Sequence, residues 1–183
     1  MKDAHVRTGK AIQQRTGRTF YLATRLLPER VRHPTYVLYG FFRVCDEVVD
    51  DPGEATPADQ RERLESLRAQ ALGDEEPDNP VLAAFRDVAD DHGIADAEID
   101  AFIDAMATDV EKRRYADYGE LETYMDGSAA AVGRMMTAVM GGDDPDRARP
   151  HATALGEAFQ LTNFLRDVRE DIVERDRIYL PQT

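Results

Sequence analysis

Signals that start and stop helices recur along this sequence, whereas the alternation of apolar and polar residues typical of strands is nearly absent. Thr56 before Pro57 is an N-cap residue followed by proline at the first helical position, and Asp96 is a further candidate N-cap. We expect helices near residues 8–27, 34–51, 57–72, 80–92, 97–114, 118–140 and 145–174. The pattern predicts an all-α fold, and no linker or repeat divides residues 1–183 into more than one domain.

Composition excludes several classes of function. The 183 residues carry a formal charge of −13, so binding to nucleic acid is not expected, because a polyanion would be repelled. Abundant aspartate with only three lysines is typical of proteins adapted to a salt-loaded cytoplasm. The single cysteine, Cys45, fits a reducing interior, and no segment approaches the ~20 apolar residues that span a bilayer. We expect a cytoplasmic protein with at most peripheral membrane contact.

A first acidic stripe lies in the segment 34–52. At 100° per residue, four polar side chains fall within about 60° of one another on a helix: Tyr39, Arg43, Asp46 and Asp50. Such a stripe is also compatible with a solvated face on which Arg43 pairs with Asp46. The remaining circumference is almost wholly apolar, however, so the carboxylates need compensation that a cavity containing cations would supply.

A second stripe occurs in the segment 157–181. Its polar members fall within an arc of about 80°: Gln160, Asn163, Asp167 and Asp171. The last three follow at i, i+4 and i+8, and offer one amide oxygen and two carboxylates, which suit Mg²⁺ better than zinc or copper. An amphipathic surface helix is the alternative interpretation of this segment taken alone.

Two such stripes on different helices favour a shared site. If the helices face each other across a bundle, their carboxylates converge, as in metal centres built inside helical bundles. Arg43 and Arg166 would then stand at the rim, where the planar guanidinium fork matches diphosphate oxygens.

The amino-acid sequences of these segments resemble the motifs of one known family. YGFFRVCDEVVDD resembles the first aspartate-rich signature of the squalene and phytoene synthases, and QLTNFLRDVREDIVERDRIYLP resembles the second. TGRTFYLATRLLP is similar to the family's diphosphate-contacting segment, and YMDGSAAAVGRMM resembles its small-residue helix beside the prenyl cavity. The resemblance, closest to phytoene synthases of halophilic archaea, implies an isoprenoid-synthase bundle around a central cavity.

The resemblance also implies roles for individual residues. Mg²⁺, with Mn²⁺ as an alternative, would be bound by Asp46, Asp50, Asn163 and Asp167, with Asp171 lining the same site. The catalytic set would be these four aspartates and Tyr39. Contacts to the prenyl diphosphates would come from Thr16, Gly17, Arg18, Thr19, Tyr39, Arg43, Gln160 and Arg166. Aromatic residues Phe20, Tyr21, Phe41 and Phe42 would line the cavity and shelter a carbocation from water.

The implied reaction joins two geranylgeranyl diphosphates head to head through a cyclopropyl diphosphate to give phytoene, without NADPH. Three alternatives stay open: a squalene or dehydrosqualene synthase using farnesyl diphosphate, a noncatalytic family member, and a head-to-tail elongase. All four aspartates are present, which disfavours a noncatalytic member, and the RDVREDIVERDRIYLP spelling is not that of head-to-tail enzymes.

Two departures from the family pattern stand out. Asp126 occupies the position where many members have a second tyrosine after Tyr124. The chain also ends soon after the RIYLP segment, where family members continue for about a hundred residues, by the same resemblance. We therefore expect the sequence to be the N-terminal two-thirds of the enzyme, with an open cavity and no phytoene-forming activity by itself.

Overall fold

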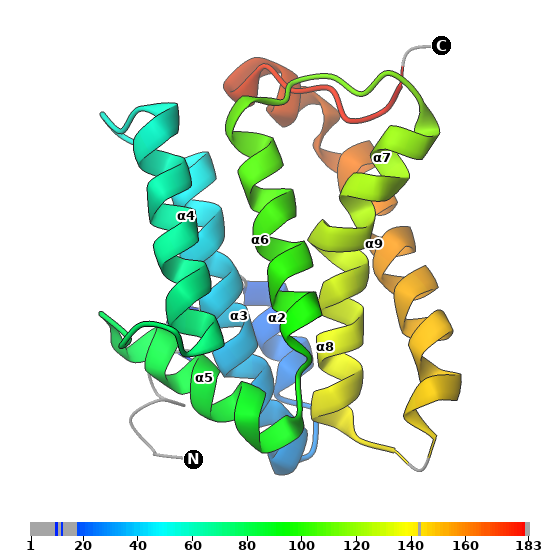
Figure 1. Ribbon diagram of the computed structural model, residues 1–183. Coiled ribbons are helices and arrows are strands. Elements are labelled where there is room, and N and C mark those ends of the chain that lie inside the picture. Colours follow the sequence, from blue (N-terminus) through cyan, green and yellow to red (C-terminus); the bar gives the residue numbers. More distant parts are fainter. Residues whose placement is uncertain (1–9, 11, 13–17, 143, 182–183) are drawn as a thin grey trace.

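The computed structural model describes residues 10, 12, 18–142 and 144–181, and within them the chain is a bundle of helices (Figure 1). Its elements are α2 (Arg18–Thr24), α3 (Glu29–Asp50), α4 (Pro57–Leu72), α5 (Pro80–His92), α6 (Asp96–Glu111), α7 (Tyr118–Met125), the π-helix η1 (Asp126–Ala130), α8 (Ala131–Met140) and α9 (Pro145–Arg175). Among the described residues the one β-type pairing is an isolated bridge between Arg114 and Ile178. The all-α expectation is confirmed.

Local chemistry sets most of the helix ends. Thr56 caps α4 through a reciprocal pair of hydrogen bonds with Asp59, and Asn79 caps α5 by accepting from two backbone N–H groups. The expected role of Asp96 is wrong: Ala95 is the N-cap, without a side-chain bond, and Asp96 is the first helical residue. There its carboxylate lies near the positive end of the helix dipole, which also favours an acidic residue.

The helix expected from residue 34 begins earlier, at Glu29, and Pro34 lies inside it. A proline removes one backbone hydrogen bond and usually ends a helix, which is why the sequence predicts a later start. Here Val31 and Pro34 are both buried, so packing on the core stabilises the extra turn. Of the helix expected over 8–27, the continuous part described is Arg18–Thr24.

The single helix expected over 118–140 is interrupted by the π-helical turn η1. Within this turn the backbone N–H of Ala131 bonds to the carbonyl of Asp126. Gly127 packs so closely on α6 that a β-carbon there would lie 2.2 Å from the carbonyl oxygen of Ala101. A residue without a side chain is therefore required where η1 crosses α6.

The core lies between α3, α5 and α6. Phe41 is fully buried and stacks on Phe85, with 3.8 Å between ring centroids, and it also contacts Phe102. Buried side chains surround most of α3, as its wide apolar arc predicts. This packing holds α3 in place and leaves one narrow strip of the helix for polar groups.

A buried charge cluster ties α9 to the rest of the bundle. Glu98 on α6 accepts hydrogen bonds from Arg134 at 2.6 Å and from Arg149 on α9 at 2.5 Å. After α9 the chain returns beside the loop that follows α6, where the N–H of Ile178 bonds to the carbonyl of Arg113 (Figure 1). The N-terminal part of α9 is thereby anchored on α6, and the segment after α9 is anchored on the loop that follows α6.

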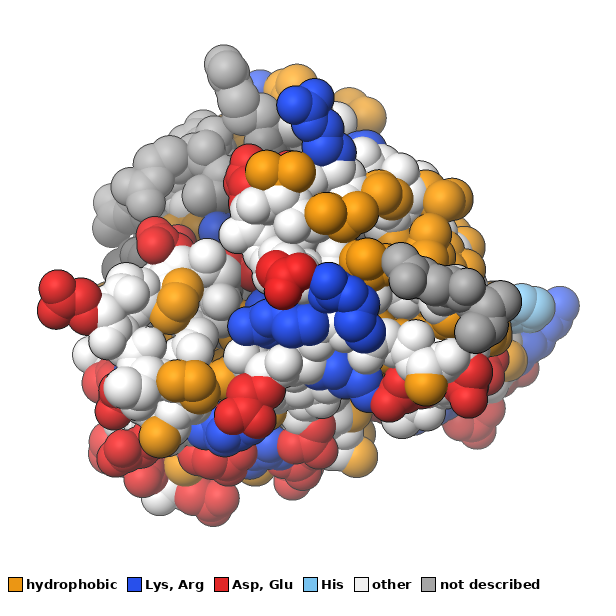
Figure 2. All heavy atoms as spheres, turned by 90° about the horizontal axis from the view of Figure 1, so that it is seen from above, with side chains coloured by type: hydrophobic (Ala, Val, Ile, Leu, Met, Phe, Trp, Pro, Cys, Tyr) orange, Lys and Arg blue, Asp and Glu red, His pale blue; other side chains and the backbone are white. Residues whose placement is uncertain are grey.

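One side of α9 is apolar yet open to solvent. Its exposed large side chains are Leu155, Phe159, Leu165, Val168, Ile172 and Val173. Figure 2 shows hydrophobic side chains gathered on one side of an end face of the molecule, beside a central group of basic ones. No helix in the described part of the chain is long and apolar enough to cross a membrane.

Candidate metal and diphosphate site

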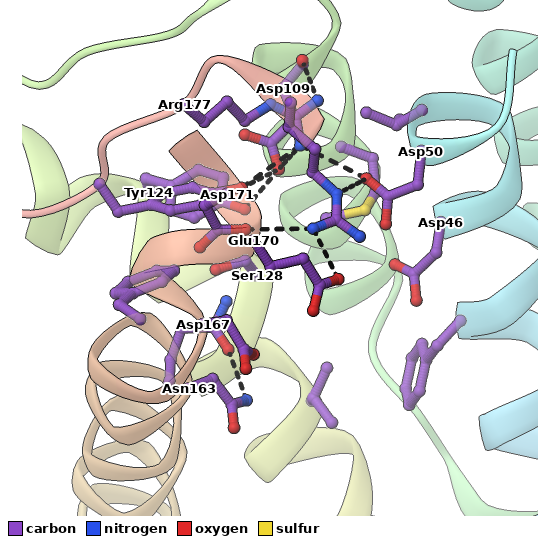
Figure 3. Close-up of a pocket in the computed structure, with 18 of the residues that line it drawn as sticks. Asp46, Asp50, Asp109, Tyr124, Ser128, Asn163, Asp167, Glu170, Asp171 and Arg177 are labelled. Carbon is purple, nitrogen blue, oxygen red and sulfur yellow. Dashed lines mark hydrogen bonds and ion pairs between the residues drawn. The ribbon is translucent and has the colours of Figure 1, made fainter. Parts of the chain in front are cut away.

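The two acidic stripes line one cavity of about 420 Å³ between α3, α6 and α9. In Figure 3, Asp46 and Asp50 on α3 stand opposite Asn163, Asp167 and Asp171 on α9. Predicted site residues that line it are Tyr39, Arg43, Asp46, Asp50, Gln160, Asn163, Arg166, Asp167 and Asp171. The expectation that the stripes face each other across a cavity is confirmed, and the residues' chemical roles stay predictions.

The first stripe presents a carboxyl group that is costly to ionise. Burial raises the pKa of Asp46 to about 7, partly opposed by Arg43 and reinforced by Asp50. The expected pairing with Arg43 exists but is long, 3.4 Å from Nη1 to Oδ2. About a third of the Asp46 side chain stays exposed, at the cavity it lines. A cation in the cavity would therefore stabilise the ionised form.

The second stripe is more strongly paired. Arg166 donates two hydrogen bonds to Asp167, at 2.7 and 2.6 Å, and this contact lowers the pKa of Asp167. Burial raises the pKa of Asp171, although Arg175 lies 3.3 Å away and opposes the shift. Asn163 donates its amide nitrogen to Gln160 at 3.4 Å, so its carbonyl oxygen is the atom that can serve as a ligand.

The described residues contain no group of three or more acidic, histidine or cysteine side chains placed to hold a metal ion by themselves. Mg²⁺ retains waters and is commonly bound by one or two carboxylates together with substrate phosphates. Oxygen ligands on both walls, and the high pKa of Asp46, suit ions shared between the protein and a diphosphate. Asp46, Asp50, Asn163, Asp167 and Asp171 would hold them.

Part of the predicted diphosphate-binding segment cannot be placed at this cavity. Thr16 and Gly17, like the side chain of Arg18, lie outside the described residues. Thr19 is exposed on α2 and is not among the residues lining the cavity. The next residue, Phe20, stacks on Tyr39 with 5.5 Å between ring centroids, so α2 contacts the rim of the site.

Sequence reasoning missed several polar side chains of the cavity: Asp109, Tyr124, Ser128, Glu170, Arg175, Arg177 and Tyr179. Asp109 is buried on α6, and Tyr124 donates to its Oδ2 atom at 2.5 Å. Burial raises the pKa of Asp109 to about 6, while Arg177 opposes the shift. A signal was present, because Asp109 continues the apolar face of Phe102 and Met106 at helical spacing.

An apolar cavity of about 480 Å³ adjoins the acidic one, and Ser128, Val132 and Gln160 line both. Its walls come from α2, α3, η1, α8 and α9: Phe20, Ala23, Thr24, Leu27, Thr35, Ala129, Gly133, Met136, Thr137, Met140, Ala152, Leu155, Gly156 and Phe159. The small-residue segment that follows Tyr124 therefore lines this space, as expected. The two cavities together offer a charged end and an apolar extension.

Two expected lining residues are placed differently. Phe42 lines the acidic cavity and Phe20 the apolar one, but Phe41 belongs to the core, because it lies on the side of α3 that packs on α5. Tyr21 stacks on Tyr36 and is not among the lining residues of either cavity. Asp126 also faces away from the acidic cavity, with its carboxylate 2.7 Å from Arg134.

Comparison with known proteins decides the family, since the squalene/phytoene synthase family model matches residues 13–183. The chain belongs to this family. It is 37% identical over 173 residues to the phytoene synthase of Pseudescherichia vulneris and 38% identical over 180 residues to that of Cereibacter sphaeroides. These alignments cover 90% and 92% of the chain but 55% and 49% of the two relatives. The squalene/phytoene synthase chain thus spans about half the length of such relatives.

Solved structures agree with the fold. A dehydrosqualene synthase in complex with a ligand is 30% identical, with a TM-score of 0.85 over 98% of this chain and 62% of its own. The squalene synthase HpnC from Alicyclobacillus acidocaldarius has a TM-score of 0.84 at 23% identity, over 98% of this chain and 66% of its own. The bundle is therefore the all-α isoprenoid-synthase fold. The halophilic and archaeal affinity inferred from composition and spelling stays a prediction.

Proposed function

We propose that this chain supplies the metal and diphosphate site for the head-to-head condensation of two geranylgeranyl diphosphates into phytoene in a Mg²⁺-dependent reaction. The observation that carries the proposal is the apposition of Asp46 and Asp50 with Asn163, Asp167 and Asp171 in a charged cavity that adjoins an apolar one. A diphosphate requires the charged end and a prenyl chain requires the apolar extension. Relatives named phytoene synthase support the C40 product.

In the proposed reaction the allylic C–O bond of one substrate breaks, and its electron pair leaves with the diphosphate. Bound Mg²⁺ would supply charge neutralisation for that leaving group. Arg43 and Arg166 would bind diphosphate oxygens, and the aspartates would orient the ions. The cation then bonds to the double bond of the second substrate, and loss of a proton gives the cyclopropyl diphosphate.

In the second half, the remaining diphosphate leaves, the ring rearranges, and loss of another proton gives phytoene. Each cation must be kept from water, which would trap it as an alcohol. The aromatic rings of Tyr39 and Phe42 line the acidic cavity and would stabilise positive charge through their π faces. No reductant is consumed in this route, so NADPH is not required.

A second candidate uses farnesyl diphosphate and makes a C30 product. The observation that favours it is the structural similarity to a dehydrosqualene synthase at 30% identity. The two candidates differ in the length of apolar chain that the cavity between α2, α8 and α9 accommodates. Both use the same acidic site.

The test incubates the full-length protein with labelled farnesyl or geranylgeranyl diphosphate, with and without NADPH, at saturating Mg²⁺. We expect phytoene from geranylgeranyl diphosphate alone and no gain from NADPH. A C30 hydrocarbon as the main product would support the farnesyl candidate instead. Absence of any joined product, with an intact fold, would support a noncatalytic family member.

A further inference from the structure

Asp109 is a buried carboxylate that the proposed metal and diphosphate chemistry does not use. It projects from α6 into the wall of the acidic cavity (Figure 3). Its Oδ2 atom accepts from Tyr124 at 2.5 Å and from Tyr179 at 3.4 Å. Its Oδ1 atom is buried and has no hydrogen-bond partner among the described residues. An unsatisfied oxygen of a buried carboxylate is costly, which indicates a second arrangement in which it is paired.

Arg177 lies beside this carboxylate with unused hydrogen-bonding capacity of its own. Its side chain is 6% exposed, and its Nη2 atom donates to the backbone carbonyl of Asp109 at 2.7 Å. Its Nη1 atom is 3.4 Å from Oδ1 of Asp50 and 4.0 Å from Oδ2 of Asp109. The Nε–H group is buried without a partner among the described residues. The guanidinium therefore stands between two carboxylates and satisfies neither fully.

Asp50 is in turn approached by two arginines. Its Oδ1 atom is 3.4 Å from Arg177 and 3.5 Å from Nε of Arg175. A divalent ion at Asp50 competes with these arginines for the carboxylate and is repelled by their positive charges. Binding of Mg²⁺ with a diphosphate at Asp50 is thus opposed unless a guanidinium moves away. Arg177 has the Asp109 carboxylate 4.0 Å from its Nη1 atom, whereas Arg175 already donates from its Nη1 atom to Glu170 at 3.0 Å.

We propose that Asp109 is a positioning residue that draws Arg177 away from Asp50 when Mg²⁺ and a diphosphate bind. In that state Arg177 pairs with the unpartnered Oδ1 of Asp109, and Asp50 is free to hold the ion. The inference rests on the metal site of the proposed function and adds a residue that acts through Arg177 without touching metal or substrate. Tyr124 and Tyr179 hold the Oδ2 atom and leave Oδ1 without a partner among the described residues.

The first measurement is the affinity of the full-length protein for Mg²⁺ in the presence of inorganic pyrophosphate, by calorimetry at pH 8. Asp109→Asn should weaken Mg²⁺ binding about tenfold, the scale seen when groups behind metal ligands are altered. The matched control is Asp104→Asn, which changes an exposed carboxylate on the same helix that pairs with Arg68. This control should bind Mg²⁺ as the unmodified protein does.

A double-mutant cycle separates this role from simple attraction between Asp109 and the ion. Arg177→Gln removes the competing cation, so Asp109→Asn in that background should have no further effect on Mg²⁺ affinity. If Asp109 only attracts the ion, its replacement weakens binding equally in both backgrounds, and the inference is wrong.

Nuclear magnetic resonance gives a readout independent of affinity. The Nε–H signal of Arg177 should shift when Mg²⁺ and pyrophosphate are added to the unmodified protein, and should not shift in Asp109→Asn. An unshifted signal in the unmodified protein, with normal Mg²⁺ binding, would overturn the positioning role alone. Failure of Mg²⁺ and pyrophosphate to bind, with Asp50→Asn equally inert, would overturn the proposed metal site and this inference together.

Discussion

The guanidinium of Arg177 lies 3.4 Å from the carboxylate of Asp50, although 127 positions separate the two residues. This contact joins the segment after α9 to the last turn of α3, and both residues line the acidic cavity. The arginines of the cavity reduce repulsion between the facing carboxylates, so the stripes can lie close without a large electrostatic cost.

Replacing a carboxylate of either stripe should abolish turnover without unfolding the protein. Asp50→Asn or Asp167→Asn in the full-length enzyme should lower kcat at least about a hundredfold, because diphosphate departure loses its charge stabilisation. Circular dichroism and product formation from labelled geranylgeranyl diphosphate are the measurements. Asp51→Asn and Glu174→Gln are matched controls, since both side chains are exposed and outside the cavity lining. If the Asp50 and Asp167 variants unfold while the control variants stay folded, the two carboxylates have a purely structural role.

Arg166→Lys should impair the enzyme even though the positive charge is kept. Arg166 uses two nitrogens to hold Asp167, a geometry that a lysine ammonium cannot reproduce. We expect kcat/KM for the prenyl diphosphate to fall about tenfold or more. Arg169→Lys, at an exposed position on the same helix outside the cavity, should leave the kinetics unchanged. Equal kinetics for both variants would remove Arg166 from the site.

Asp46 should make stability fall as pH rises. Its pKa is raised to about 7, so between about pH 4 and 7 the folded protein binds more protons than the unfolded chain. The contribution of Asp46 to the free energy of unfolding therefore decreases as the pH rises through this range. The Asp46→Asn variant has no carboxyl group to ionise at this position, so it does not lose stability in this way. At pH 8 its free energy of unfolding should exceed that of the unmodified protein by about 1 kcal/mol, after allowance for partial solvent screening.

Urea unfolding of both proteins at pH 5 and pH 8 checks this expectation. The stability advantage of Asp46→Asn should be larger at pH 8 and should shrink when Mg²⁺ and pyrophosphate are added, because a cation favours the ionised carboxylate. An advantage that is the same at both pH values would contradict the assignment.

The exposed apolar side of α9 predicts the behaviour of residues 1–183 in isolation. Phe159, Leu165 and Val173 are 63%, 67% and 73% exposed, and such surface favours self-association. We expect this chain alone to bind a hydrophobic dye, and to form prenyl alcohol but no phytoene from geranylgeranyl diphosphate and Mg²⁺, because water reaches the cation. Efficient phytoene formation by residues 1–183 would mean that these helices form a sufficient catalytic unit.

The sequence by itself determined the helical class, most helix ends and the composition of both acidic stripes. Each depends on interactions within a few residues: Thr56 with Asp59, Asn79 with its own helix, and carboxylates one turn apart. The periodicity of α3 also indicated a helix packed on most sides, which its buried residues confirm. Such features can be predicted from the sequence because, on a helix, the spacing of residues along the chain sets the directions of their side chains.

Tertiary structure alone decided which groups complete the site. From the sequence alone, Asp109 is one residue of an amphipathic helix and Arg177 is part of a charged segment. Packing of α6 against the segment after α9 brings the two residues together. Packing likewise places Phe41 in the core and extends α3 toward the N-terminus, from Pro34 to Glu29. It also introduces η1 where Gly127 meets α6. These outcomes depend on contacts between residues distant in sequence, whose free energies outweigh local preference.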